Sequence, residues 1–108
     1  MVTKSEFVEL ATGLEGTVSA PHFDRTALKV KRNYATLAAD GLTANLKLKP
    51  DEQELKCLTH PEAFAPVPNA WGKQGWTTAT LSELTVAELR DALEMAWRHA
   101  VGKKQRKT

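Results

Sequence analysis

The sequence lacks features that would cross-link the chain or anchor it in a membrane. Among its 108 residues Cys57 is the only cysteine, so no disulfide can form within the chain. No apolar run approaches the roughly 20 residues that a membrane-spanning helix requires. Lys4, Glu6 and Glu9 give the start a charged character unlike the apolar stretch of a secretory signal. These absences favour a cytoplasmic protein that folds without disulfides and has no membrane partner.

A large net charge is also missing. The formal net charge of +2 is too small to require an anionic partner, and its distribution is uneven. Four of the 15 basic residues stand in the tail, so the rest of the chain has 11 basic residues against 13 acidic ones. We therefore expect one domain over residues 1–101 and a flexible basic tail over 102–108. The tail cations are Lys103, Lys104, Arg106 and Lys107.

Motifs for nucleophilic or phosphate chemistry are missing. The sequence has no G-x-S-x-G, no P-loop and no G-x-G-x-x-G. Gly72-Lys73 is followed by Gln74, where a P-loop needs serine or threonine. We interpret Gly72 and Gly75 as residues of a tight turn that the neighbouring tryptophans anchor to the core.

Metal and acid–base sites are equally poorly supported. Cys57 and His60 stand three residues apart, but no second pair of cysteine or histidine completes a zinc set. His22 and Asp24 resemble a dyad without a nucleophile, and Asp24 is better suited to a turn. With Arg25 they would be the first suspects for an activity. We expect no enzyme, no metal and no cofactor.

Hydrophobic spacing predicts helices at both ends of the domain. The first covers about residues 4–14, and Thr3 with Glu6 has capping-box spacing. The last begins at Thr85, repeats the box with Glu88, and carries an apolar stripe up to Ala100. A middle helix is predicted to open at residues 50–51 and to end at residue 60, before a proline. Its capping pair is Asp51 and Glu54, and its core residues are Leu55 and Leu58.

Alternating residues between these helices predict strands. We expect strands over residues 17–20, 26–31, 34–39, 42–48 and 75–81, with Pro21 stopping the first and Asp40-Gly41 forming a hairpin turn. Residues 61–74 read as a packed loop. The order of elements predicts an α+β, two-layer domain: an antiparallel sheet with helices packed on one face.

Basic residues are expected on the outer face of that sheet. If Leu28 points inward, Arg25 and Lys29 point outward, and Lys47 does so on a later strand. Such a surface could meet phosphates, although lysine also simply keeps a sheet face soluble. Tyr34 is the only aromatic residue expected nearby, so stacking of single strands is not predicted. The candidate cations are Arg25, Lys29, Lys31, Arg32, Lys47 and Lys49.

Several segments together resemble the MmcQ/YjbR-like bacterial proteins. They are residues 22–30 (HFDRTALKV), 34–37 (YATL), 60–64 (HPEAF), 71–76 (WGKQGW) and 89–97. The resemblance implies a CyaY-like fold and DNA binding through a "double-wing" motif. Family members often have a glycine-containing turn where this chain has Lys31-Arg32-Asn33, so the hairpin geometry at that wing is expected to differ.

Two functions remain open. The first is weak, sequence-nonspecific DNA binding through the basic sheet face and tail. The second is a protein-interaction or small-ligand module without catalytic activity, formed by the segment from His60 to Trp76. In both cases a monomer is favoured over an oligomer. The candidates for the second function are His22, Phe64, Trp71, Lys73 and Trp76.

Overall fold

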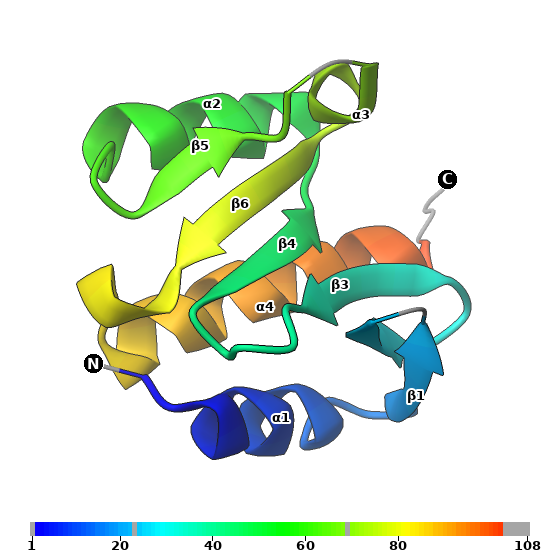
Figure 1. The fold of residues 1–108 in the computed structure, drawn as a ribbon. Helices are drawn as coiled ribbons and strands as arrows, with labels where there is room; N and C mark the ends of the chain where they lie inside the picture. Colours follow the sequence, from blue (N-terminus) through cyan, green and yellow to red (C-terminus); the bar gives the residue numbers. More distant parts are fainter. Residues whose placement is uncertain (1, 23, 69, 103–108) are drawn as a thin grey trace.

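The computed structural model describes residues 2–22, 24–68 and 70–102. Its strands form one antiparallel sheet in the order β1-β2-β3-β4-β6-β5 (Figure 1). The strands are β1 (Val18–His22), β2 (Arg25–Lys29), β3 (Asn33–Leu37), β4 (Thr43–Lys47), β5 (Phe64–Pro66) and β6 (Trp76–Thr80). The helices are α1 (Lys4–Thr12), α2 (Pro50–Thr59), α3 (Ala70–Lys73), the short 3-10 helix η1 (Leu81–Glu83) and α4 (Val86–Val101).

One face of the sheet carries the core. Alternate residues of β2, β3 and β4, among them Leu28, Leu37 and Leu46, point to this face and are buried. Helix α4 lies across it and contacts β3 and β4, and α1 packs beside α4 (Figure 1). Ion pairs join α2 to α4 on the same side. The α+β class and the single helix-covered face are confirmed.

The terminal helices form as the sequence predicts. Thr3 accepts a hydrogen bond from the backbone N–H of Glu6, whose carboxylate accepts one from the backbone of Thr3. Thr85 and Glu88 build the same reciprocal box at the start of α4. The predicted stripe of α4 is also confirmed, since Leu89, Leu93 and other residues at that spacing are buried.

The predicted start of α2 is confirmed, whereas its predicted capping pair and its predicted core residues were wrong. The helix begins at Pro50, with Lys49 as N-cap, and the carboxylate that reaches back to the Lys49 N–H is Glu52 rather than Glu54. Proline fits the first helical position because its fixed φ suits the helix and its missing N–H is not needed there. Leu55 and Leu58 point outward and are 54% and 73% exposed.

The strand ends differ from the predicted ones by one or two residues, and two of the differences have a clear cause. Strand β1 runs through Pro21 to residue 22; it is an edge strand, where a missing N–H breaks no ladder. The β3–β4 turn is longer than a two-residue hairpin, since Ala38 N–H bonds to Thr43 O. Leu42 therefore belongs to the turn, is 64% exposed, and does not face the core as predicted.

Tyr34 is buried, not near the outer surface as expected. The register between β2 and β3 shifts at Leu28 and Lys29, which places an extra residue in β3. Tyr34 and Ala35 are consequently both buried. The Tyr34 hydroxyl lies 2.9 Å from the Thr17 hydroxyl and donates to Ala11 O at the end of α1.

Residues 61–74 contain regular structure that was predicted as loop. Strand β5 pairs with β6, and the helical turn α3 precedes β6. Gly75 has φ +107°, and a Cβ there would collide with Leu48 O; a Cβ on Gly72 would collide with Val67 O. The glycine turn is thus confirmed. It brings the chain close to the end of β4 and sets where Trp71 and Trp76 lie.

Candidate functional site

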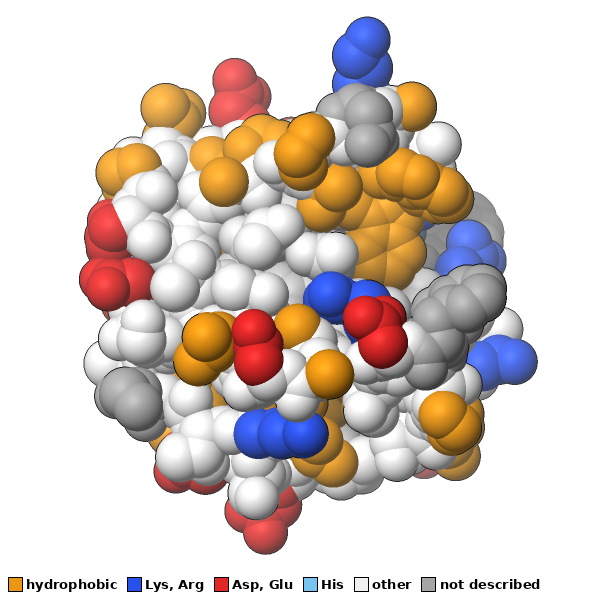
Figure 2. Space-filling model, in the orientation of Figure 1, with side chains coloured by type: hydrophobic (Ala, Val, Ile, Leu, Met, Phe, Trp, Pro, Cys, Tyr) orange, Lys and Arg blue, Asp and Glu red, His pale blue; other side chains and the backbone are white. Residues whose placement is uncertain are grey.

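In the part of the chain that the structure describes, no helix lies across the sheet face opposite the main core, which we call the open face (Figure 1). Because Thr36 pairs with Asn45 and Asn45 with Thr78, these three side chains form a row across β3, β4 and β6. All three are only partly buried. Figure 2 shows this face as mostly uncharged, with hydrophobic side chains gathered at its upper right and with blue atoms of basic side chains beside red atoms of acidic ones near its centre. The face therefore offers hydrogen-bonding groups beside an apolar area.

A hollow of about 250 Å³ lies on this open face. Its floor comes from the strands, with Thr36 of β3 and Asn45 of β4. Its apolar wall comes from side chains before and at the start of β6, among them Trp71, which is 58% exposed. The lining residues are Arg25, Thr36, Asn45, Val67, Trp71 and Trp76. The hollow thus joins Arg25 of the predicted basic face to the two tryptophans of the alternative hypothesis.

Arg25 is held by β3. Its Nε donates to the Thr36 hydroxyl at 2.9 Å, and its Nη2 donates to Thr36 O at 3.3 Å. These bonds use two of the five N–H donors of the guanidinium. Over the described ranges the ion pairs are Lys56–Asp91, His60–Glu88 and Glu94–Arg98, so Arg25 forms no ion pair with a carboxylate there. The hollow is therefore bordered by a fixed positive charge.

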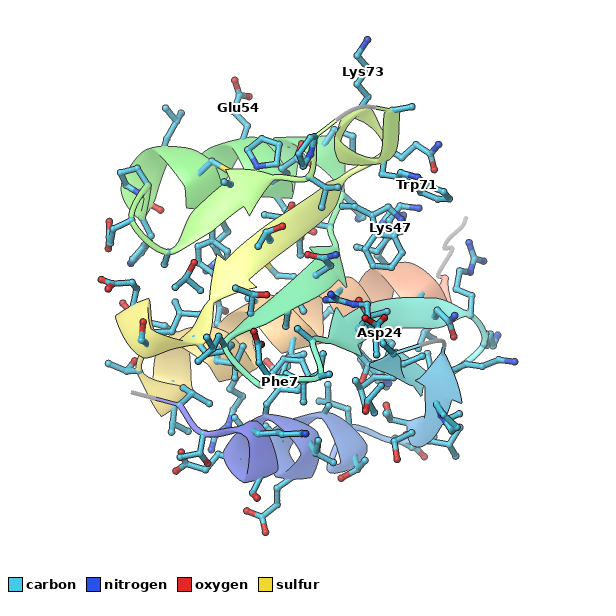
Figure 3. The ribbon with its side chains drawn as sticks, in the orientation of Figure 1. Phe7, Asp24, Lys47, Glu54, Trp71 and Lys73 are labelled. Atoms are coloured by element: carbon cyan, nitrogen blue, oxygen red, sulfur yellow. The ribbon has the colours of Figure 1, made fainter. Side chains whose placement is uncertain are left out.

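Lys47 and Asn45 add further donors on β4. Lys47 Nζ lies 5.7 Å from the centroid of the Trp76 ring, a distance at which a cation and an indole attract. Asn45 Oδ1 accepts a hydrogen bond from the Thr78 hydroxyl at 2.9 Å. Its amide nitrogen is then the group left to face a ligand. Figure 3 shows Trp71 above Lys47 on the near side of the sheet.

The predicted basic residues are spread over several elements of the fold. Strand β3 separates β2 from β4, so the backbones that carry Lys29 and Lys47 lie two strand spacings, about 10 Å, apart. Lys29 is exposed on β2, Lys31 and Arg32 are exposed in the following turn, and Lys49 is exposed where α2 begins.

Several basic residues influence His99 near the end of α4. Burial lowers the pKa of His99, and Lys47 and Lys49 lower it further; Glu52 raises it and Arg32 lowers it again. Positive charges from β4, the start of α2 and the β2–β3 turn therefore act on one histidine. Lys47 links this group to the hollow.

The residues of the alternative hypothesis do not all lie at the hollow. Trp71 and Trp76 line the hollow, but Phe64 is 3% exposed and belongs to the core. Trp71 does not anchor the turn to the core as predicted. Lys73 is exposed at the end of α3 (Figure 3). His22 ends β1, and its side chain lies outside the described structure, as do Lys103, Lys104, Arg106 and Lys107.

Sequence reasoning missed Thr36, Asn45 and Val67, and it wrongly denied aromatic residues to the basic face. The alternation that turns Lys47 outward turns Asn45 and Thr43 outward too, so that signal was available. The position of the tryptophans was not, because it depends on β6 pairing with β4 rather than with β3.

Other reactive groups do not assemble a centre. Within the part of the chain that the structure describes, no three histidine, cysteine or acidic side chains stand together as metal ligands. Burial raises the pKa of the partly buried Cys57 thiol, which makes it a poor nucleophile. No helix of the described segments has both the length and the apolar character to cross a bilayer.

Comparisons with known proteins agree with this architecture. A crystal structure of a Deinococcus radiodurans protein with a DUF419 domain superimposes with a TM-score of 0.82 at 24% identity, covering 99% of this chain and 84% of that one. At that identity the likeness shows the fold. The curated proteins include no match. The family model described as YjbR matches residues 12–99, which confirms the resemblance seen in the sequence. The chain therefore belongs to the YjbR family.

Proposed function

We propose that this protein is a non-catalytic module that binds nucleic acid through the open face of its sheet. One observation carries the proposal: Arg25 lines a hollow walled by two tryptophans, and Lys47 lies beside one of these rings. Neither cation is paired with a carboxylate among the described residues. Proteins that hold nucleic acid strands without reading sequence combine these same elements, cations for phosphates and aromatic rings for bases.

The expected binding is weak and falls with salt. Each phosphate that a cation neutralises releases counterions, so the slope of log affinity against log salt reports the number of contacts. The few cations near the hollow, with a body that has more acidic than basic residues, predict a shallow slope. We propose that Lys29, Lys31, Arg32 and Lys49 extend the contact beyond the hollow, and that the tail adds nonspecific attraction.

Fluorescence anisotropy with labelled DNA at several salt concentrations tests the proposal. Lys47→Gln is expected to weaken binding several-fold and to reduce the salt slope by about 1. Arg90→Gln is the matched control, because Arg90 is exposed on α4 behind the sheet. Equal loss in both variants would show a bulk charge effect and contradict the proposed surface.

A tail variant separates the domain from its end. Replacing Lys103, Lys104, Arg106 and Lys107 by serine is expected to reduce affinity while preserving the effect of Lys47→Gln. If binding disappears with the tail charges, the sheet face is not the site. His99 offers an independent readout, since DNA bound beside Lys47 should raise the pKa that these cations lower. Proton NMR titration of the imidazole would detect the shift.

The alternative module has its own support. Trp71 is 58% exposed, an unusual exposure for so large an apolar side chain, and it borders the same hollow. A small anionic ligand with an aromatic ring would satisfy the same groups. A thermal-shift assay with aromatic carboxylates tests this alternative. A rise in the melting temperature with these compounds, together with no binding of DNA, would support the small-ligand module.

A further inference from the structure

The hollow on the open face has features that select among nucleic acids. Its volume of about 250 Å³ is below the roughly 300–1,000 Å³ of pockets that enclose drug-sized molecules. It is therefore suited to one ring system rather than to a large ligand. The apolar wall comes from Trp71, Trp76 and Val67, which are outside the main core.

A duplex cannot fill such a hollow. Paired bases present only their edges, in the grooves, whereas stacking on an indole needs the face of a base. Single strands expose that face, and aromatic side chains in single-strand binding proteins use it irrespective of sequence. The tryptophans therefore favour an unpaired base.

The polar side of the hollow complements the edge of a base and its phosphate. Arg25 and Asn45 present N–H groups, and bases and phosphates supply acceptor atoms. The two hydrogen bonds to Thr36 fix the guanidinium before any ligand arrives, which reduces the entropy lost on binding. Lys47, beside Trp76, is placed to reach the backbone that follows the base.

We infer that the hollow between Arg25 and the two tryptophans is a subsite for one unstacked base, so that the protein prefers single-stranded nucleic acid to duplex. The inference rests on the proposed function and specifies its ligand class. Asp24 works against it, because Figure 3 places this exposed carboxylate on the same face, where it repels phosphate. It gives the test a variant expected to improve binding.

The test compares three labelled probes of equal length with the full chain: oligo(dT), a strand with abasic sites in place of the bases, and a duplex. We expect oligo(dT) to bind about tenfold more tightly than either of the others, within the range that stacking of one base provides. The abasic strand keeps the phosphates. The difference in affinity between it and oligo(dT) therefore isolates the contribution of the base.

Variants assign the difference to the hollow. Trp71→Ala should remove most of the tenfold preference and leave abasic binding unchanged, while Trp71→Phe should retain part of it. Trp97→Phe is the matched control, since this indole lies on α4 and donates to Glu15 O. Asp24→Asn should tighten binding of all three probes a few-fold. Circular dichroism verifies that each variant is folded.

The outcomes separate the inference from the proposed function. Equal affinity for all three probes, or a preference that Trp71→Ala and Trp76→Phe both leave intact, would overturn the base subsite while nucleic-acid binding stands. Absence of binding to every probe at low salt would overturn both. In the Trp97→Phe background, quenching of the remaining emission by oligo(dT) but not by the abasic strand would support the subsite directly.

Discussion

Helices α2 and α4 use their amphipathic patterns in opposite ways. Helix α4 buries its leucines against β3 and β4, as its spacing predicts. Helix α2 turns Leu55 and Leu58 to solvent and buries Lys56 instead. Lys56 donates to Asp91 at 2.6 Å and lies 5.9 Å from the Phe64 ring centroid. The difference teaches that a short helix can be oriented by a few specific polar contacts.

Those contacts reach the candidate site. Gln53 Nε2 on α2 donates to the carbonyl oxygens of Gly72 and Trp76 at 3.0 and 3.1 Å. One side chain thus connects α2 to α3 and to the start of β6. Gln53 needs the inward face of the helix, and this is one physical reason why the leucines of α2 point outward.

The largest contrast between the helices should come from the same substitution in each. Leu93→Ala in α4 is expected to lower the free energy of unfolding by about 2–5 kcal/mol, because Leu93 is 1% exposed in the core. Leu58→Ala in α2 should change it by less than about 0.5 kcal/mol. Urea unfolding measures both. Comparable losses would show that Leu58 is covered in solution.

The helix starts differ as well. Thr85→Ala should lower the free energy of unfolding by about 1 kcal/mol, because the threonine hydroxyl accepts a hydrogen bond from the Glu88 N–H. Lys49 has the extended backbone of an N-cap, but its side chain makes no capping hydrogen bond. Lys49→Ser should therefore raise the free energy of unfolding by roughly 0.5–1 kcal/mol. Thermal unfolding of the two variants would reveal the opposite signs. Destabilisation by Lys49→Ser would contradict this expectation and show that the lysine side chain itself stabilises the fold.

The Lys56–Asp91 bridge should make a smaller contribution. The Lys56 side chain is 11% exposed and that of Asp91 is 55% exposed, so water screens the pair from one side. A double-mutant cycle with Lys56→Met and Asp91→Asn is expected to give a coupling of about 1 kcal/mol. Glu94–Arg98, an exposed pair 3.7 Å apart within α4, is the control and should couple more weakly.

A pH effect also connects the two helices. The Thr85 backbone N–H holds the pKa of Glu88 below its ordinary value of 4.5; the Thr85 hydroxyl and His60 lower it further, while desolvation opposes them. Because the folded pKa is the lower one, the stabilisation is complete above about 4.5 and is lost as the pH falls through the folded value. The free energy of unfolding of Glu88→Gln, measured across that pH window, should approach that of the wild type as the pH falls. Glu62→Gln, an exposed carboxyl elsewhere, is the reference.

Local rules predicted much of the fold because the relevant contacts are local. Thr3 with Glu6 and Thr85 with Glu88 act within a few residues, as do Gly72 and Gly75 where they close their turn, and all were anticipated. The helix-covered sheet followed from alternation along β4. The orientation of α2 could not be predicted, since Lys56 meets Asp91 across 35 residues of sequence.

The candidate site was divided between two hypotheses for the same reason. Arg25 and Lys47 were read as one surface, and Trp71 with Trp76 as another. Only the pairing of β6 with β4 brings them together, and no local pattern specifies that neighbour. Tyr34 was misplaced because a bulge shifts the register by one residue, which the sequence does not announce.

The position of β6 has a consequence for synthesis. Strands β1 to β4 follow one another along the chain, but β4 gains its second neighbour only when residues 76–80 have been made, and α4 follows later still. Until then the nascent chain exposes an unpaired strand edge and the uncovered leucines of an unfinished core. We expect the chain to associate with other chains most readily during this interval of translation, because exposed apolar surface and unpaired strand edges favour aggregation.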